Sequence, residues 1–313
     1  MAFTMHSHSG QFCPGHAKGQ LEDIIQHAIR VGYKTMGLTE HMPRTSVDDL
    51  YPEELTPSPS TTLASLAPLH AEFLSHASHL QSEYASQIHI LIGFESEWLR
   101  PTEYLPLIRS LASDPRVDYF LGSLHHVSGI PIDYDKAFYA TAVSHCGSER
   151  DLWATYYDEQ YGMLTGLEPK VVGHFDLIRL MSSCPAKDVQ RDWPEVWEKM
   201  VRNLREVKRY GGWLEVNTSA LRKGLEEPYP ARAVAVEWIG MGGRFTFSDD
   251  SHGVEQVATC YGKGLDYLQG LGVQEVWTWE RGTEGGKAEL REKAVSIEEF
   301  RGCLRMEEVR SPQ

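Results

Sequence analysis

The sequence lacks the features that mark membrane and secreted proteins. It contains no run of about eighteen apolar residues, the length that a membrane-spanning helix needs, and its N-terminus has no basic segment followed by an apolar stretch. Its five cysteines are widely scattered, and no two of them have a Cys-x-x-Cys spacing, so no disulfide framework is indicated. We therefore expect a cytoplasmic protein with reduced thiols and no membrane partner.

Positive charge is also scarce. Lysine and arginine number 30 against 44 aspartates and glutamates, which gives a formal net charge of −14. This balance disfavours nonspecific attraction to nucleic acid or to an anionic membrane surface. We expect no nucleic-acid partner, and any phosphate group that the protein binds must be held by metal ions or by a few arginines.

Composition and length are those of a folded globular protein. Apolar residues make up 41% and charged residues 24% of the 313 residues. Length alone permits one large domain or two small ones, but the chain contains no internal repeat and no low-complexity linker. We predict a single domain over residues 1–313.

Apolar segments of strand length alternate with segments of helical periodicity. The predicted strands cover residues 2–5, 33–38, 89–94, 117–122, 170–172, 213–216 and 244–247. The predicted helices cover residues 20–29, 63–86, 151–164, 192–210, 229–241, 261–270 and 296–305. Residues 44–62 and 129–148 lack this periodicity and are predicted loop insertions. An apolar segment at 273–279 and a glycine-rich turn at 285–286 belong to a C-terminal extension that begins at about residue 280.

Metal-binding or catalytic side chains follow directly after these strands. His6 and His8 end the first strand, and side chains two positions apart on a strand point to the same side. Strands that alternate with helices imply a parallel sheet. We predict an α/β fold, a (β/α)7 TIM-like barrel of parallel strands whose active site lies at the C-terminal face of the strands. An open doubly wound sheet is the alternative, but it would use few strand ends, and the sequence has no glycine-rich fingerprint for it.

The residues at the strand ends form a set of metal-ligand candidates. They are His6, His8, His16, His41, Glu95, His125, His126, His174, Asp250 and His252. Histidine and carboxylate ligands suit Zn, Fe or Mn, and this set exceeds what one ion needs, so two or three ions are implied. Any one of these histidines could be an ordinary core or surface residue, but their shared placement after strands favours metal binding. The remaining histidines lie within helices, strands or loops and are interpreted as non-ligands, namely His27, His70, His76, His79, His89 and His145.

These motifs resemble, in order along the chain, those of the polymerase-and-histidinol-phosphatase (PHP) superfamily. The matching motifs are His6-x-His8, Phe12-Cys13-Pro14-Gly15-His16, Thr39-Glu40-His41, Gly93-Phe94-Glu95, Gly122-Ser123-Leu124-His125, Gly173-His174-Phe175-Asp176 and Asp250-Ser251-His252. Within that superfamily, the histidinol-phosphate phosphatase branch is the most similar. The similarity to this branch lies in Phe12-Cys13, Leu214-Glu215-Val216-Asn217-Thr218-Ser219, Arg222-Lys223 and Ser248-Asp249-Asp250-Ser251-His252.

The resemblance implies a distorted seven-stranded (β/α) barrel that holds three divalent or trivalent metal ions, which we expect to be Zn, Fe or Mn. By this resemblance, the first ion is bound by His6, His8 and Asp250, and Glu95 bridges it to a second ion. The second ion is bound by His125 and His174, and the third by His16, His41 and His252. Only one of His125 and His126 can easily face the site at a strand end, and the motif selects His125, which leaves His126 in a supporting position.

The implied activity is hydrolysis of a phosphate monoester, L-histidinol phosphate, to L-histidinol and phosphate in histidine biosynthesis. Asp250, His252 and Glu95 are the predicted catalytic residues. Substrate binding is assigned to Arg179, Arg222 and Asn217, because arginine recognises phosphate in a planar, bidentate manner and both arginines resemble phosphate contacts of the family. Asp176 is expected to orient a ligand, and Asp249 and Glu97 either to support ligands or to contact a cationic substrate amine. The proton donor for the leaving group stays open between His252 and a neighbouring aspartate.

Two other functions are compatible with the sequence. The first is a PHP-type phosphoesterase that acts on a nucleotide or on another phosphate ester. The second is a noncatalytic metal-stabilised module, which the complete ligand set and the absence of an additional domain disfavour. No oligomeric state follows from the sequence.

Overall fold

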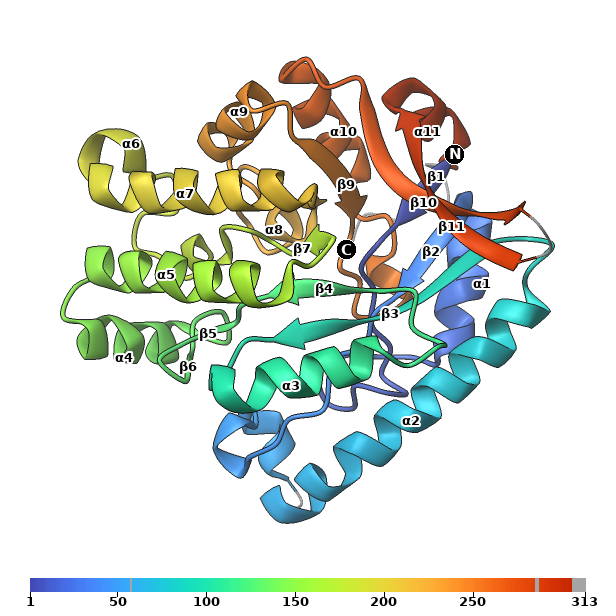
Figure 1. Ribbon diagram of the computed structural model, residues 1–313, viewed down its shortest axis with the longest axis horizontal. Helices are drawn as coiled ribbons and strands as arrows, with labels where there is room; N and C mark the ends of the chain where they lie inside the picture. The colour runs from blue at the N-terminus through green and yellow to red at the C-terminus, as the bar shows by residue number, and fades with distance from the viewer. Residues whose placement is uncertain (57, 285–286, 306–313) are drawn as a thin grey trace.

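The computed structural model describes residues 1–56, 58–284 and 287–305, and in these residues seven parallel strands form a nearly closed barrel (Figure 1). In order around the barrel they are β1 (Ala2–Thr4), β2 (Tyr33–Leu38), β3 (His89–Glu97), β4 (Tyr119–Ser123), β7 (Val171–Val172), β8 (Trp213–Asn217) and β9 (Arg244–Ser248). The barrel closes between β9 and β1, where the amide of Met5 donates to the carbonyl of Phe247 at 3.2 Å and the amide of His8 to Ser251 at 2.8 Å. The predicted barrel and its parallel strands are therefore confirmed.

Helices connect the strands and cover the outside of the barrel (Figure 1). The long ones are α1 (Leu21–Val31), α2 (Pro59–Glu83), α3 (Pro101–Ala112), α5 (Glu149–Leu167), α7 (Pro194–Tyr210), α9 (Arg232–Gly240) and α10 (Tyr261–Gly270). The short ones are η3 (Leu177–Arg179), α6 (Val189–Asp192), α8 (Ser219–Arg222) and η4 (Val254–Gln256). Helix α1 illustrates why the sequence pattern worked: its inner face buries Leu21, Ile24 and Ala28, and it ends at Gly32, whose φ of 99° suits glycine.

The segment predicted as an irregular loop at 129–148 is largely ordered secondary structure, so that prediction was wrong. A small ribbon of β5 (His126–Val127) and β6 (Ile130–Pro131) leads into helix α4 (Lys136–Cys146). Asp135 caps this helix by accepting hydrogen bonds from the amides of residues 137 and 138, both at 2.8 Å. The helix buries only Tyr139 and Ala142, and so little burial leaves no helical pattern in the sequence. Helix α3 was also not predicted, because prolines lie at its start and inside it.

The predicted excursion at 44–62 contains two short turns, η1 (Val47–Asp49) and η2 (Pro52–Leu55), before α2 begins at Pro59. One ion pair lies within this segment, and another joins it to helix α3. Arg44 pairs with Glu54 at 2.8 Å, and Asp49 pairs with Arg100 at the start of α3. The excursion is therefore an ordered wall above the C-terminal ends of β2 and β3.

A long antiparallel hairpin closes the opposite end of the barrel. It consists of β10 (Glu275–Glu284) and β11 (Lys287–Ser296), followed by α11 (Ile297–Cys303); the glycine-rich turn predicted at 285–286 lies outside the described residues. The Trp279 ring lies 4.6 Å from that of Trp213 and 5.1 Å from that of Tyr119, both at the starts of barrel strands. The strand starts are thus covered by aromatic packing, whereas the strand ends remain available for a site.

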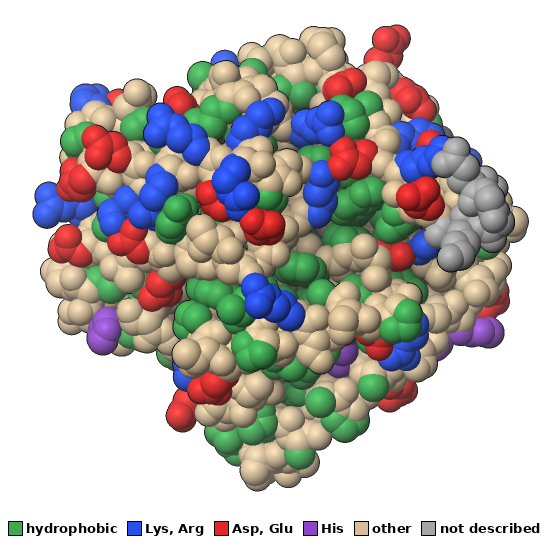
Figure 2. All heavy atoms as spheres, viewed as in Figure 1, with side chains coloured by type: hydrophobic (Ala, Val, Ile, Leu, Met, Phe, Trp, Pro, Cys, Tyr) green, Lys and Arg blue, Asp and Glu red, His purple; other side chains and the backbone are tan. Residues whose placement is uncertain are grey.

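The surface and the helices agree with the expected charge and hydropathy. Figure 2 shows basic and acidic side chains interspersed on one face of the molecule, with apolar side chains between them. In the part of the chain that the structure describes, we find no helix with the length and apolar character required to span a membrane.

Candidate metal centre and active site

The carboxylate of Glu95, on β3, lies at the centre of the candidate site and is 1% exposed. Its Oε2 atom is 3.2 Å from His6 Nε2, 3.4 Å from His8 Nε2 and 3.2 Å from His41 Nδ1. Parallel register brings the strand ends to the same level, which is why histidines that follow β1 and β2 reach a glutamate of β3. One oxygen of Glu95 therefore faces three imidazoles.

The second oxygen of Glu95 faces a different pair of histidines. Its Oε1 atom is 2.8 Å from His174 Nε2 and 3.2 Å from His125 Nε2, and these two ring nitrogens are 3.2 Å apart. His126 points elsewhere: its Nδ1 is 3.4 Å from the Glu97 carboxylate. The geometry of Glu95 is that of a carboxylate that can bridge two cations.

Asp250 lies beside the first of these two groups. Its Oδ1 atom is 3.6 Å from His6 Nε2, 3.5 Å from His8 Nε2 and 3.5 Å from His252 Nδ1. Its other oxygen, Oδ2, accepts hydrogen bonds from Asn217 at 3.3 Å and from the Ser219 hydroxyl at 3.2 Å. The backbone of Asp250 has a φ of 50°, a conformation in which aspartate is tolerated better than most residues. The side chain is therefore held with Oδ1 toward the histidines.

The donor atoms fit metal ions in number, type and spacing. Three groups each bring their ligand atoms within 4.8 Å of one another: His6, His8 and Asp250; His6, Glu95 and His174; and His8, His41 and His252. Two ligands bound at tetrahedral angles to zinc lie about 3.4 Å apart, close to the separations observed here. Among the described residues, the Nε2 atoms of His6 and His8 are buried without a hydrogen-bond partner. Buried lone pairs that converge in this way are satisfied by cations.

His16 lies at the edge of the cluster. Its ring centroid is 4.9 Å from that of His252 and 5.3 Å from that of His41, but its Nδ1 is 3.0 Å from Glu53 and its side chain is 34% exposed. The structure thus places His16 next to its two predicted partners, while His8 is the residue whose ligand atom groups with theirs. The assignment of His16 to a third ion stays a prediction.

A second layer of carboxylates orients the histidines from behind. His6 Nδ1 donates to Glu215 Oε1 at 2.8 Å, and the amide of His174 donates to Glu215 Oε2 at 2.8 Å. Likewise, His125 Nδ1 lies 2.7 Å from Glu97. A carboxylate on one ring nitrogen fixes the tautomer that leaves the other nitrogen free for a metal. The sequence interpretation gave Glu215 no role, although its position two residues before Asn217 places both side chains on one face of β8.

The electrostatics of the site reflect competition between burial and charge. Burial lowers the pKa of His6, but the carboxylates of Glu95, Asp250 and Glu215 together outweigh it and raise that pKa well above its usual value. In the same way, nearby histidines hold the pKa of Glu95 far below its usual value despite burial. The site therefore places carboxylate charge opposite groups that carry positive charge.

The predicted substrate-binding residues have different surroundings. Arg222 lines the cavity above the donor cluster, and its guanidinium donates to the carbonyls of Asp249 and Asp250, both at 2.9 Å. Arg179 is buried, lies 3.0 Å from Asp176 Oδ2 and donates to the carbonyls of Glu227 and Pro228. Within the described chain it does not line that cavity.

Two predicted supporting aspartates and Asn217 lie in the framework around the metal cluster. Asp176 also accepts a hydrogen bond from the amide of Ala231 at 2.8 Å. Asp249 accepts from Tyr33 at 2.6 Å and from the amide of residue 258 at 2.7 Å. Asn217 donates to Glu215 at 3.1 Å as well as to Asp250, so it acts on a predicted ligand rather than facing open solvent. All three side chains are buried.

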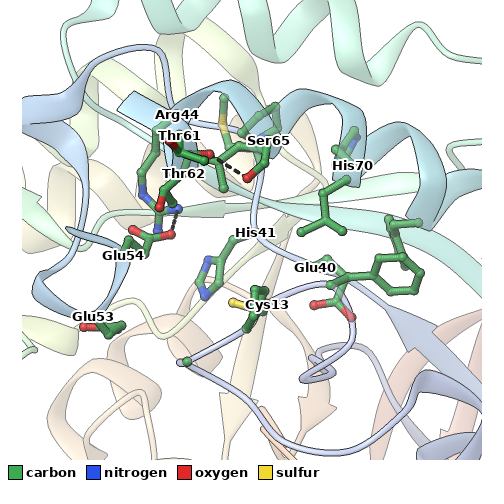
Figure 3. A pocket seen from close by; sticks show the side chains of 18 of the residues that line it. Cys13, Glu40, His41, Arg44, Glu53, Glu54, Thr61, Thr62, Ser65 and His70 are labelled. Atoms are coloured by element: carbon green, nitrogen blue, oxygen red, sulfur yellow. Dashed lines mark hydrogen bonds and ion pairs between the residues drawn. The ribbon is translucent and has the colours of Figure 1, made fainter. Parts of the chain in front are cut away.

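The cavity above the cluster has a volume of about 410 Å³. Predicted metal ligands form its floor, and its walls carry Tyr51, Asp133, Tyr134, Leu177, Arg222, Lys223 and Gln256. A second cavity of about 480 Å³ lies behind His41, between the 44–58 excursion and α2. Figure 3 shows Cys13, Glu40 and His41 along its edge, with Arg44 and Glu54 joined by their ion pair. Of these two cavities, the first is lined by seven of the predicted ligands, namely His16, His41, Glu95, His125, His174, Asp250 and His252.

Comparisons with known proteins agree with this geometry. Residues 4–219 match the PHP domain family. The chain is 41% identical over 296 residues to "Probable histidinol-phosphatase" of Schizosaccharomyces pombe, covering 94% of this chain and 95% of that protein. It is 35% identical over 292 residues to histidinol-phosphatase of Saccharomyces cerevisiae, covering 84% of this chain and 87% of that protein.

A solved structure extends the comparison to three dimensions. It is the histidinol phosphate phosphatase of Lactococcus lactis in complex with zinc, L-histidinol and phosphate. The two chains superpose with a TM-score of 0.65 at 19% identity, covering 92% of this chain and 98% of that one. The fold, the donor cluster and the sequence relatives lead to the same assignment: the chain belongs to the PHP domain family, in its histidinol-phosphatase branch.

Proposed function

We propose that the protein is a metal-dependent phosphatase that hydrolyses L-histidinol phosphate to L-histidinol and phosphate, a step of histidine biosynthesis. The observation that carries the proposal is the convergence of buried imidazoles on the two oxygens of Glu95, beneath a cavity large enough for a small phosphate ester. The relatives that cover most of the chain are named for this activity. The proposed partner is therefore a small molecule, and the proposed location is the cytoplasm.

We further propose three ions per chain, of Zn, Fe or Mn, in the residue sets predicted from the sequence. The first is held by His6, His8 and Asp250, the second by His125 and His174 with Glu95 as the bridge. The third is held by His16, His41 and His252. Zinc in the Lactococcus lactis protein and the donor groups described above support metal binding, and the ion count is our inference.

The chain's own residues perform the remaining tasks. Bound ions supply Lewis acidity toward the phosphoryl group and a nucleophilic water at neutral pH. Asp250 lines the cavity, and its carboxylate can take a proton from the attacking water and pass it to the leaving alkoxide, while His252, 3.5 Å away, acts as a ligand. Arg222 and Lys223 add positive charge on the same wall, where a phosphate group is stabilised. We assign Arg179 and Asn217 to keeping this wall in place.

The test is phosphate release from L-histidinol phosphate by protein loaded with Zn, Mn or Fe. We expect turnover with at least one metal, and faster turnover than on a nucleotide monophosphate or on glycerol phosphate. A failure with every metal would overturn the proposal, and equal rates on all esters would point to a general phosphoesterase. Metal analysis of protein purified without chelator is expected to find about three ions per chain.

A further inference from the structure

Part of the wall of the active-site cavity comes from the two predicted insertions. Residues 44–56 contribute Tyr51, and the segment that follows β6 contributes Asp133 and Tyr134. None of these side chains belongs to a donor group that could hold a metal ion in the described residues. Their presence over the metal cluster needs a different explanation.

This wall is rigid. The amide of Tyr51 donates to Glu54 Oε2 at 2.8 Å, and Glu54 is held in turn by Arg44. The Tyr51 ring packs 5.3 Å from the ring of His126 and 6.0 Å from that of Tyr134. On the other segment, the amide of residue 132 donates to the carbonyl of His125 at 2.9 Å. Residues 51 and 133 are therefore fixed relative to the metal ligands before any substrate binds.

Asp133 is the charged group of this wall. In the residues described, its Oδ1 atom is buried without a hydrogen-bond partner. Its neighbours in the cavity lining are the tyrosines Tyr51 and Tyr134. A buried carboxylate oxygen without a partner, next to aromatic rings, is stabilised when a cation binds to it.

Positive charge occurs at a different place in the cavity. Lys223 lines the cavity next to Arg222, at the C-terminal end of α8, which follows β8. Arg222 lies on the same side through its bonds to the carbonyls of Asp249 and Asp250. The cavity therefore offers positive charge and metal ligands in one region, and a carboxylate with aromatic rings in another.

We infer that Asp133 is a specificity-determining residue that binds the cationic nitrogen end of the substrate, with Tyr51 and Tyr134 flanking it. The chemical class that fits is a phosphate monoester with an ammonium or imidazolium group several bonds from phosphorus. The phosphate lies at the metal cluster, and the cationic nitrogen donates a hydrogen bond to the Asp133 carboxylate. This inference rests on the proposed function and names the part of the substrate that the two insertions recognise.

The test compares Asp133→Asn with wild type on two substrates, L-histidinol phosphate and phenyl phosphate, whose leaving group carries no cation. The variant keeps the shape of the side chain and removes its charge. We expect the KM for L-histidinol phosphate to rise about 10- to 100-fold, as for the loss of a charge-assisted hydrogen bond, and the KM for phenyl phosphate to stay within about twofold. Asp133→Glu is expected to restore part of the preference.

Asp135→Asn is the matched control. It removes the same charge two residues away, and asparagine caps a helix as well as aspartate does, so α4 is preserved and the kinetics on both substrates should not change. Equal losses on both substrates in Asp133→Asn would show a merely structural role, and unchanged constants would show that Asp133 makes no contact. Either result overturns the inference.

A binding measurement separates this inference from the proposed function. Titration calorimetry of L-histidinol into metal-loaded protein in the presence of inorganic phosphate reports the contact without turnover. We expect Asp133→Asn to weaken L-histidinol binding about 10- to 100-fold and to leave the affinity for phosphate unchanged. If wild type bound L-histidinol but did not hydrolyse its phosphate ester, the proposed function would fail and the Asp133 contact would stand. If both proteins bound L-histidinol equally, the Asp133 contact would fail alone.

Discussion

The two ends of the barrel are built from opposite kinds of side chains. At the C-terminal ends of the strands, buried imidazoles and carboxylates converge around Glu95, and several of their polar atoms are buried without a hydrogen-bond partner among the described residues. At the N-terminal ends, Trp279 of the β10–β11 hairpin packs against Trp213 and Tyr119. Burial of charged and polar groups at the first end costs folding free energy, whereas burial of apolar side chains at the second end stabilises the fold. In a parallel barrel, function is thus separated from stability along the barrel axis.

The largest expected effect is at the metal end. Asp250→Asn removes a charged donor that faces His6 and His8, so we expect kcat/KM on L-histidinol phosphate to fall by at least about 1,000-fold. Bound metal should fall below the wild-type content, as measured by elemental analysis. Asp266→Asn, on the exposed surface of α10, is the control and should keep both. Normal activity in Asp250→Asn would refute the central role of this aspartate.

The next largest effect is expected at the N-terminal ends of the strands. Trp279→Ala deletes a buried ring from the hairpin contact, and the free energy of unfolding should fall by about 3–5 kcal/mol in a denaturant titration. Because the metal cluster lies at the opposite end, kcat per folded molecule should stay within about twofold of wild type. Lys293→Ala, on the same hairpin, removes only a surface ion pair and should cost less than about 1 kcal/mol. A large loss of kcat in Trp279→Ala would mean that the two ends are coupled.

A smaller effect is expected from the layer behind the ligands. Glu215→Gln replaces the carboxylate that accepts from His6 Nδ1, and we expect zinc affinity to fall about 10- to 100-fold in a chelator competition. The fold should be unaffected in circular dichroism, because glutamine occupies the same space. Glu198→Gln, on the exposed face of α7, should leave zinc affinity unchanged. An unchanged zinc affinity in Glu215→Gln would remove this residue from the metal site.

The smallest effect concerns a histidine near the site that is not a predicted ligand. Burial, the main cause, lowers the pKa of His70 from 6.5 to about 4. Its folded value lies below its unfolded value, so the unfolded chain takes up a proton first as the pH falls. This histidine should therefore reduce stability by up to about 2 kcal/mol between pH 7 and pH 5. In His70→Gln, the loss of unfolding free energy over that interval should be smaller by about this amount, and an identical pH dependence would contradict the prediction.

The sequence predicted the strands and the candidate ligands for a physical reason. Parallel strands align their carboxyl ends, so residues such as His41, Glu95 and Asp250 could be grouped by their position after apolar segments, without any knowledge of side-chain geometry. The resemblance to the PHP family then assigned each of these residues to one of three metal ions. That ordering depends on distances, and the structure groups His8 with His41 and His252, a relation that no spacing along the chain could have indicated.

Other features left no periodic signal to detect. Helix α4 buries too few residues to show a pattern, and the prolines of α3 masked it. The sequence could not show where the Arg179 side chain points. Whether a long side chain reaches a cavity or an adjacent aspartate depends on its rotamer and on the packing around it. Asp133 stood in a stretch interpreted as irregular loop, and only the structure shows that its buried Oδ1 atom lacks a hydrogen-bond partner among the described residues.

The seam between β9 and β1 has a consequence for how long the folded enzyme survives. Thr4 and Asp249, which face each other across this seam through a hydrogen bond, are 245 positions apart in the chain. A cation bound by His6, His8 and Asp250 would act as a reversible cross-link between the first strand of the barrel and the last one. Joining such distant segments offsets the entropy of closing a very long loop. When metal is scarce, the barrel would therefore begin to unfold at the contact between β9 and β1. The metal supply would then affect the lifetime of the folded protein as well as its activity.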